Sequence, residues 1–151
     1  MLKLEPVKPA RIEDHLQLIL EFNRTEQITT PTPLIRSALE RLLSQPELGR
    51  AWFILPDGED GELAGYVNLT FGFDLEYAGR DAWITDFYIR PPYQGRGIGS
   101  RALALLELEA RGLGAGAIHL MVRPDNLHAQ SLYRRHGFEP NPRQAWIRIL
   151  R

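Results

Sequence analysis

The feature that most restricts how this chain can fold is a loop with three glycines at alternate positions, Gly95, Gly97 and Gly99. The apolar residues 82–89 before it predict a strand that ends at a pair of prolines, and residues 98–111 after it have leucines at helical spacing. The first amides of a helix lack internal acceptors and lie at the positive end of its dipole. Because glycine has no Cβ, a phosphate can approach such a loop closely. The pattern therefore predicts either a phosphate site or a turn that only packs a helix on a strand.

Composition excludes several kinds of site. Cysteine is absent from the 151 residues, which excludes disulfides, thiolate nucleophiles and cysteine-ligated metals. The four histidines show no metal-ligand spacing, so no metal is expected. No apolar run reaches the roughly 18 residues of a membrane helix, and the first residues lack an apolar signal core. We therefore expect a single domain over residues 1–151, cytoplasmic and without a membrane partner.

The charges are divided unevenly along the chain, although the net charge is only −1. Residues 1–86 carry 8 Lys or Arg against 15 Asp or Glu, whereas residues 87–151 carry 10 Arg against 4 Asp or Glu. Because arginine binds phosphate with two N–H groups at once, this bias fits an anionic ligand on the C-terminal part and a cationic one near the N-terminal part. Charges scattered over a solvated surface are the alternative. No Lys/Arg run occurs, so nucleic acid is not an expected partner.

The rest of the chain predicts an α+β (mixed α/β) fold around one central sheet. Apolar residues at helical spacing predict helices over residues 10–22, 32–44, 98–111 and 127–136. Strands are predicted over residues 2–7, 51–55, 63–73, 82–89, 117–122 and 144–150. The three tryptophans are expected in the core: Trp52, Trp83 and Trp146.

Two other kinds of glycine loop have to be considered. The segment from Gly97 to Ala102 matches the dinucleotide fingerprint G-x-G-x-x-A. That fingerprint belongs in the first strand–helix unit of a parallel sheet, whereas here it follows several strands that read as antiparallel. Asp125 lies only near the position of the expected ribose ligand, so a nicotinamide-binding protein stays an imperfect alternative. A nucleotide-hydrolysing loop needs a lysine, and none occurs after Lys8.

Two motifs in the right order give a more specific reading. Gln94-x-x-Gly97-x-Gly99 after a strand resembles the acetyl-CoA loop of the GNAT N-acetyltransferase superfamily. About 30 residues later, the pattern Asn-x-x-Ala-x-x-x-Tyr-x-x-x-Gly-Phe, which runs from Asn126 to Phe138, is similar to that family's second signature. The resemblance covers nearly the whole chain. It implies a mostly antiparallel, splayed sheet of about 6–7 strands flanked by about 4 helices.

The resemblance also implies roles for particular residues in binding acetyl-CoA. Backbone groups of Phe87, Tyr88 and Ile89 would lie beside the pantetheine arm. The diphosphate would be held by the loop, whose residues are Gln94, Gly95, Arg96, Gly97, Ile98, Gly99 and Ser100. Asn126 would bind the cofactor near the pantetheine, and the Tyr133 hydroxyl would protonate the departing thiolate as general acid. Four arginines are candidates for outer phosphate contacts: Arg96, Arg101, Arg134 and Arg135.

The general base is the part that the resemblance does not supply. In some members of the family it is a Glu five residues before the Asn, and here that position is Met121. Asp86 is the best substitute, because strand alternation would place it with Ile84 and Tyr88 on one face, and burial would raise its pKa. Glu76 is a weaker candidate, and ordered water is the remaining option.

The acceptor is expected to be a small cationic amine or a polyamine. Acidic and aromatic residues occur together in the segments that build the acceptor pocket in this family, and both favour a cation. The acidic candidates are Glu26, Asp74, Glu76 and Asp86, and the aromatic ones are Phe22, Phe71, Phe73 and Tyr77. A protein N-terminal or lysine acetyltransferase, and a silent acyl-CoA sensor, are the alternatives. The resemblance also allows a homodimer.

Overall fold

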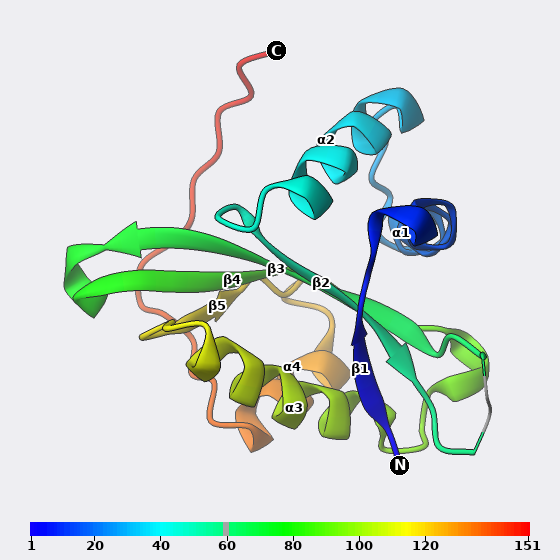
Figure 1. Ribbon diagram of the computed structural model, residues 1–151. Helices are drawn as coiled ribbons and strands as arrows, with labels where there is room; N and C mark the ends of the chain where they lie inside the picture. Colours follow the sequence, from blue (N-terminus) through cyan, green and yellow to red (C-terminus); the bar gives the residue numbers. More distant parts are fainter. Residues whose placement is uncertain (59–60) are drawn as a thin grey trace. The chain divides into compact units, whose positions relative to one another are not determined.

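The computed structural model describes residues 1–58 and 61–151 and divides them into two compact units. The first unit runs from Met1 to Met121 and contains the sheet. The second runs from Val122 to Arg151 and contains one helix. Figure 1 shows the helices and strands of both units.

The first unit is built on five strands that lie in the order of the sequence. They are β1 (Lys3–Pro6), β2 (Gly49–Leu55), β3 (Gly65–Asp74), β4 (Gly79–Ile89) and β5 (Ile118–Leu120). Neighbouring strands pair antiparallel, except that β4 and β5 are parallel. The predicted mixed, mostly antiparallel sheet is therefore confirmed, with fewer strands than the expected 6–7.

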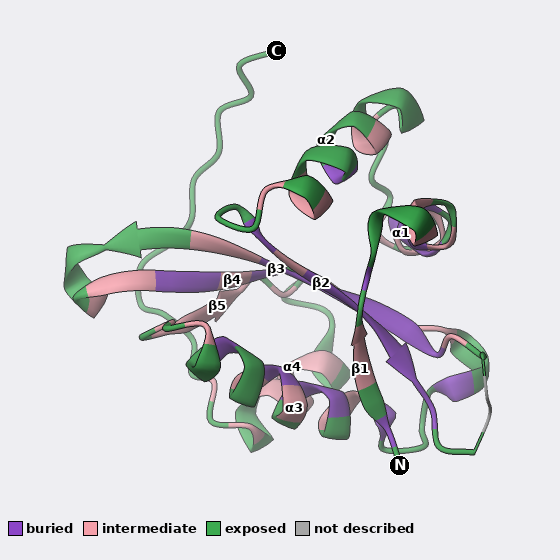
Figure 2. Ribbon diagram, viewed as in Figure 1, coloured by how far each residue is buried: buried purple, intermediate pink, exposed green. Residues whose placement is uncertain are grey.

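Three helices of this unit cover the two faces of the sheet. The helices α1 (Ile12–Glu26) and α2 (Thr32–Ser44) lie on one face, and α3 (Ile98–Gly112) lies on the other (Figure 1). Successive side chains of a strand point to opposite faces. Accordingly Phe53 packs in the core under α1 and α2, while its neighbour Ile54 packs in the core with Ile98 of α3. The central strands are buried and the tip of the β3–β4 hairpin is exposed (Figure 2).

A bulge interrupts β4 and changes which face its residues occupy. Asp86 pairs with Asn68 of β3, but the next pair along is Ile84 with Leu69, so Thr85 is an extra residue without a partner in β3. Asn68 and Leu69 are adjacent and face opposite sides, and their partners Asp86 and Ile84 do the same. The expectation that Ile84 shares a face with Asp86 is therefore wrong, because simple alternation does not hold across a bulge.

The parallel pairing with β5 covers only the first part of β4. It joins Ala82–Ile84 to Ile118–Leu120 and stops there. Within the described residues, the rest of β4 has no strand partner on that side, while it remains paired with β3 as far as Ile89. This is the splay that the sequence predicted, and it lies next to the bulge.

The second unit contains α4 (Leu127–Arg135), whose two ends are both capped. The Asn126 side chain accepts a hydrogen bond from the backbone N–H of Ala129 at 3.1 Å, as an N-cap does. At the other end Gly137 has φ 82°, and the N–H of Phe138 donates to the carbonyl of Tyr133 at 3.0 Å. This pattern is a Schellman motif, in which the last turn is closed by a left-handed glycine.

The strand predicted over residues 144–150 is wrong, as is the placement of Trp146 in a core. These residues have no regular secondary structure, and Trp146 is 90% exposed. An apolar pattern can indicate a strand, but the strand exists only where another strand completes its hydrogen bonds.

The described residues contain neither a helix suited to cross a membrane nor a cluster of metal-ligating side chains. No helix among them has both the length and the apolar character needed to cross a bilayer. In the same ranges, 1–58 and 61–151, no group of three or more His, Asp or Glu side chains is placed to hold a metal ion.

Candidate functional site

The glycine loop joins β4 to α3, and two of its glycines have backbone angles that other residues rarely adopt. Gly95 has φ 72°, and Gly97, the N-cap of α3, has φ 73°. Glycine populates this left-handed region without the clash that a Cβ brings. A Cβ at either position would meet no atom within 4 Å, so the surface of the loop is open. The start of α3 is thus presented on an open surface, which suits an anion.

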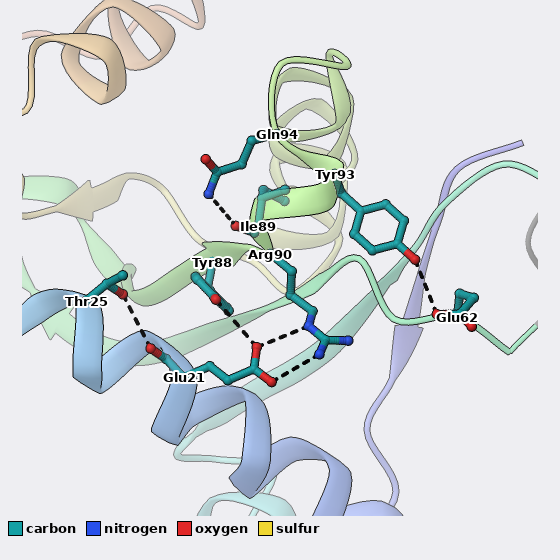
Figure 3. A network of polar contacts seen from close by, with 8 residues as sticks. All are labelled: Glu21, Thr25, Glu62, Tyr88, Ile89, Arg90, Tyr93 and Gln94. Carbon is teal, nitrogen blue, oxygen red and sulfur yellow. Dashed lines mark hydrogen bonds and ion pairs between the residues drawn. The ribbon is translucent and has the colours of Figure 1, made fainter.

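Side chains anchor this loop at its beginning. The Gln94 amide donates to the Ile89 carbonyl at 2.8 Å, which ties the loop to the end of β4 (Figure 3). The buried Tyr93 donates its hydroxyl hydrogen to Glu62 at 3.2 Å (Figure 3). The Arg96 guanidinium lies 5.4 Å from the centre of the Tyr93 ring. These contacts attach the beginning of the loop to the first unit.

The splayed end of β4 offers backbone groups along a free edge. Phe87, Tyr88 and Ile89 lie on this part of the strand, which pairs with β3 and, among the described residues, with no second strand. Phe87 and Ile89 pack against the hydrophobic cluster that contains Ile98 of α3. Tyr88 belongs to the hydrophobic cluster under α1 and α2. Their side chains pack on both faces of the strand, and no second described strand pairs with the backbone edge of these residues.

Asp86 is half-buried next to the bulge and receives two hydrogen bonds on the same oxygen. The Tyr66 hydroxyl and the Asn68 amide both donate to Oδ2 at 3.0 Å. Among the described residues, no donor reaches Oδ1. That oxygen is therefore able to accept a proton. Burial raises the pKa of the Asp86 carboxyl above its usual value, while the two hydrogen bonds act in the opposite direction. A half-buried carboxylate of this kind suits a general base.

Sequence reasoning missed Asn68 and also His15, which contacts Asn68. His15 of α1 is fully buried, and its Nε2 lies 2.9 Å from Asn68 Oδ1. Burial lowers the pKa of His15 to about 4, although the hydrogen bond with Asn68 acts in the opposite direction. The side chain is therefore neutral near pH 7. Its position 53 residues before Asn68 gave no local signal in the sequence.

A second missed feature joins α1 to the end of β4. Arg90 donates from Nε and from a terminal nitrogen to the two oxygens of Glu21, each at 3.1 Å (Figure 3). The Tyr88 hydroxyl donates to the same carboxylate at 3.4 Å. Glu21 is nearly buried, with 16% of its side chain exposed. This two-pronged ion pair fixes the strand just before the glycine loop begins.

The structure brings only some of the predicted acceptor residues together. Phe22 contacts the rings of Tyr66 and Tyr88 at 6.3 and 5.9 Å, and Glu26 lies one helical turn later on the same face of α1. Glu76, in contrast, lies in the exposed turn that follows Asp74, and Asp74 is already six strand residues, or roughly 20 Å, from Asn68. Asp74, Phe73 and Tyr77 belong to the same hairpin end, so the predicted residues do not form one cluster.

Comparison with known proteins assigns the chain to a family. A family model described as "Acetyltransferase (GNAT) family" matches residues 15–138. The chain belongs to the GNAT family. The resemblance found in the glycine loop and in the Asn126–Phe138 segment is thus confirmed.

Individual GNAT relatives cover smaller parts of the chain. It is 33% identical to the spermine/spermidine N(1)-acetyltransferase of Bacillus subtilis over 85 residues, which are 54% of this chain and 56% of the relative. It is 38% identical to the N-alpha-acetyltransferase RimI of Mycobacterium tuberculosis over 86 residues, 52% of this chain and 47% of the relative. The chain thus spans about half the length of the curated relatives it matches.

One solved structure matches along almost the whole chain. This is the integron cassette protein HFX_CASS3 from the mobile metagenome of Cole Harbour Salt Marsh. Its TM-score is 0.85 at 29% sequence identity, over 98% of this chain and 90% of that one. The likeness extends over both units that the structure describes.

The second GNAT motif owes its spacing to the way α4 ends. The hydrogen bond from Phe138 to Tyr133 places their side chains at the two positions of a Schellman motif that usually contact each other. Their ring centres are 5.8 Å apart in an edge-to-face arrangement. The pattern Tyr-x-x-x-Gly-Phe therefore holds the half-buried Tyr133 ring in place at the end of the helix.

Four of the ten arginines in residues 87–151 form the following ion pairs. Arg90 pairs with Glu21 at 3.1 Å and Arg101 with Asp57 at 2.5 Å. Arg111 pairs with Glu107 at 2.6 Å, and Arg123 with Asp125 at 3.3 Å. The charge bias in the sequence is thus partly balanced within the fold.

Proposed function

We propose that this GNAT-family protein transfers an acetyl group from acetyl-CoA to the primary amine of a small cationic acceptor. The observation that carries the proposal is the left-handed pair Gly95 and Gly97 at an open helix start. This pair directly follows a strand edge that pairs with no second strand among the described residues. A diphosphate fits the first feature, and an extended amide-bearing chain fits the second. CoA has both groups on one molecule.

The residues around the loop suit the two ends of such a ligand. Backbone groups of Phe87, Tyr88 and Ile89 would hydrogen-bond the pantetheine amides as a further strand would. The loop of residues 94–100 would hold the diphosphate through its N–H groups. Asn126 and Tyr133 of the second unit keep the cofactor roles that the GNAT motif implies.

Two proton transfers are needed, and each has a candidate residue. The ammonium of the acceptor must lose a proton before its nitrogen attacks, and Asp86 would accept it on Oδ1. The departing thiolate must gain a proton, and the Tyr133 hydroxyl would donate it, because a phenol is protonated near pH 7. When bound, acetyl-CoA supplies the activated acetyl group as a thioester.

Charge and aromatic character support a cationic acceptor. Among the described residues of the first unit, Asp86 and Glu26 have no cationic partner. Phe22, Tyr66 and Tyr88 form a cluster of rings, and the Tyr66 hydroxyl of this cluster donates to Asp86. Rings and carboxylates together attract an ammonium group. The Bacillus relative is named for spermine and spermidine, which belong to this class. A protein N-terminus is the second candidate, because the Mycobacterium relative is named an N-alpha-acetyltransferase.

Calorimetry and an acceptor panel test this proposal together. Acetyl-CoA should bind in a titration in which NAD gives no heat. Thiol release should then be followed with spermidine, short diamines, lysine and an N-terminal alanine peptide at equal concentrations. Turnover with the small amines supports the proposal, and turnover with the peptide alone would move the acceptor class to proteins. Binding without turnover on any acceptor would indicate a silent acyl-CoA sensor, and absent binding would overturn the proposal.

A further inference from the structure

We propose that His15 is a positioning residue that holds the Asn68 amide in the orientation in which it donates to Asp86. This inference rests on the proposed function, in which Asp86 receives the proton of the amine. Three side chains from three elements form the chain of contacts: His15 of α1, Asn68 of β3 and Asp86 of β4.

The orientation of the Asn68 amide decides whether it stabilises or repels the carboxylate. Its oxygen lies 2.9 Å from His15 Nε2, and its nitrogen lies 3.0 Å from Asp86 Oδ2. A half-turn of the amide would bring its oxygen against Oδ2, and two acceptors would then face each other. A proton on His15 Nε2 makes the observed orientation the favourable one, because that N–H has the amide oxygen as its acceptor.

The surroundings of His15 suit a positioning role and not direct participation in the reaction. The side chain is fully buried, between the rings of Phe53 and Tyr66 at 5.9 and 5.2 Å. Its Nδ1 has no hydrogen-bond partner among residues 1–58 and 61–151, which agrees with a neutral ring whose single proton is on Nε2. Burial lowers its pKa to about 4, so the ring stays neutral at the pH where an amine reacts. His15 thus acts on Asp86 through Asn68.

Several other titratable groups face Asp86 and must stay constant in a test. Tyr66 of β3 donates to it directly, and Tyr88 lies on the same face of β4. Glu21 of α1 pairs with Arg90 at the end of β4, so these two charges largely offset each other. None of these groups contacts the His15 ring nitrogens. A substitution of His15 therefore changes the Asn68 contact while leaving the neighbouring charges in place.

The test is a carboxyl NMR titration of Asp86 in the unliganded protein, with the signal assigned through Asp86→Asn. His15→Leu removes the N–H, so Asp86 loses its aligned donor and its pKa should rise by about one unit. His15→Gln places an N–H near the position of Nε2 and should reverse most of that rise. Leu18→Ala, a buried apolar change on the same helix, is the control and should leave the Asp86 pKa unchanged.

The outcomes separate this inference from the proposed function. An unchanged Asp86 pKa in His15→Leu would overturn the positioning role, whatever the activity. Full activity in Asp86→Asn would overturn the role of Asp86 as base, while the titration result would stand. If His15→Leu does not fold, the ¹⁵N spectrum of the wild-type histidine decides. A proton on Nε2 supports the inference, and a proton on Nδ1 overturns it.

Discussion

Asn68 lies directly opposite Asp86 across the β3–β4 ladder and donates to its Oδ2 at 3.0 Å. Tyr66, two residues earlier on the same face of β3, donates to the same oxygen at the same distance. The carboxylate is thus held through one oxygen, and among the described residues no donor reaches the other, as the proposed role of Asp86 requires.

Replacing Asp86 by Asn should lower kcat by about 100-fold while the Kd for acetyl-CoA stays the same, because only proton removal is affected. The wild-type rate should fall as pH decreases, since the protonated carboxyl cannot accept a proton. Burial raises the pKa of Asp86, so this fall should begin above the usual carboxyl range near pH 4. Glu76→Gln at the hairpin tip is the control. An unchanged pH–rate profile in Asp86→Asn would remove Asp86 from the role.

Replacing Gly97 by Ala should weaken acetyl-CoA binding about tenfold, which calorimetry measures. Alanine in the left-handed region is disfavoured by roughly 1–2 kcal/mol, so the loop should relax and its N–H groups should turn away. Gly58 is a matched control, because it has φ 71° and open space around it but lies in the β2–β3 turn. Gly58→Ala should carry the same strain without weaker binding. Equal losses in both variants would point to general destabilisation.

Replacing Tyr133 by Phe should keep the ring contact with Phe138 and remove only the hydroxyl. We expect kcat to fall about 10- to 100-fold with little change in thermal stability. Phe138→Ala should show the opposite pattern, with a lower melting temperature from the loosened end of α4. Thiol release and thermal unfolding measured on both variants test the pair. Full turnover in Tyr133→Phe would show that a group other than the Tyr133 hydroxyl protonates the thiolate.

Because of His15, the protein should be less stable in mild acid than at pH 7. Burial lowers its pKa from 6.5 to about 4, so between these values the unfolded chain binds a proton that the folded chain does not. The free energy of unfolding should therefore fall by about 3 kcal/mol as pH decreases through that window, and the contribution is complete above pH 6.5. Urea unfolding at pH 7 and pH 4.5 should show this loss in the wild type and a smaller one in His15→Gln. Asp86 acts in the opposite direction in both proteins.

Replacing Glu21 by Gln should destabilise the first unit by about 1–2 kcal/mol, because Arg90 keeps its charge and loses its two-pronged acceptor. The combined variant with Arg90→Met should be less destabilised than the two single losses added together. Chemical unfolding of the wild type, the two single variants and the combined variant completes this double-mutant cycle. Strict additivity would show that the observed pair contributes no coupling energy.

Local patterns were enough to predict most elements of the fold. The turn and proline signals at residues 31–33 and 44–49 bound the helix Thr32–Ser44 as predicted, and the glycine loop marks the start of α3 at Ile98. Both signals act within a few residues. The final strand was predicted wrongly because residues 144–150 have the apolar pattern, and pattern alone does not provide a pairing partner.

The site was predictable only where its residues are close in sequence. The glycine loop and the spacing of Tyr133, Gly137 and Phe138 are local, and they pointed to the correct family. The ion pair of Glu21 with Arg90 joins residues 69 apart, and nothing near either one indicates the other. The bulge at Thr85 was equally invisible, because threonine is an ordinary strand residue and only the register of β3 reveals it.

The bulge has a consequence for comparing this strand with its counterparts in other proteins. Ile84 and Asp86 are two residues apart yet face opposite sides, because Thr85 is skipped in the pairing with β3. A counterpart that lacked this one residue would have a regular ladder with the same side chains on the same sides. In an alignment, a one-residue gap at Thr85 would therefore leave every other side chain of the strand facing the same helices as before. It would remove only the extra residue that follows the last β4–β5 pair.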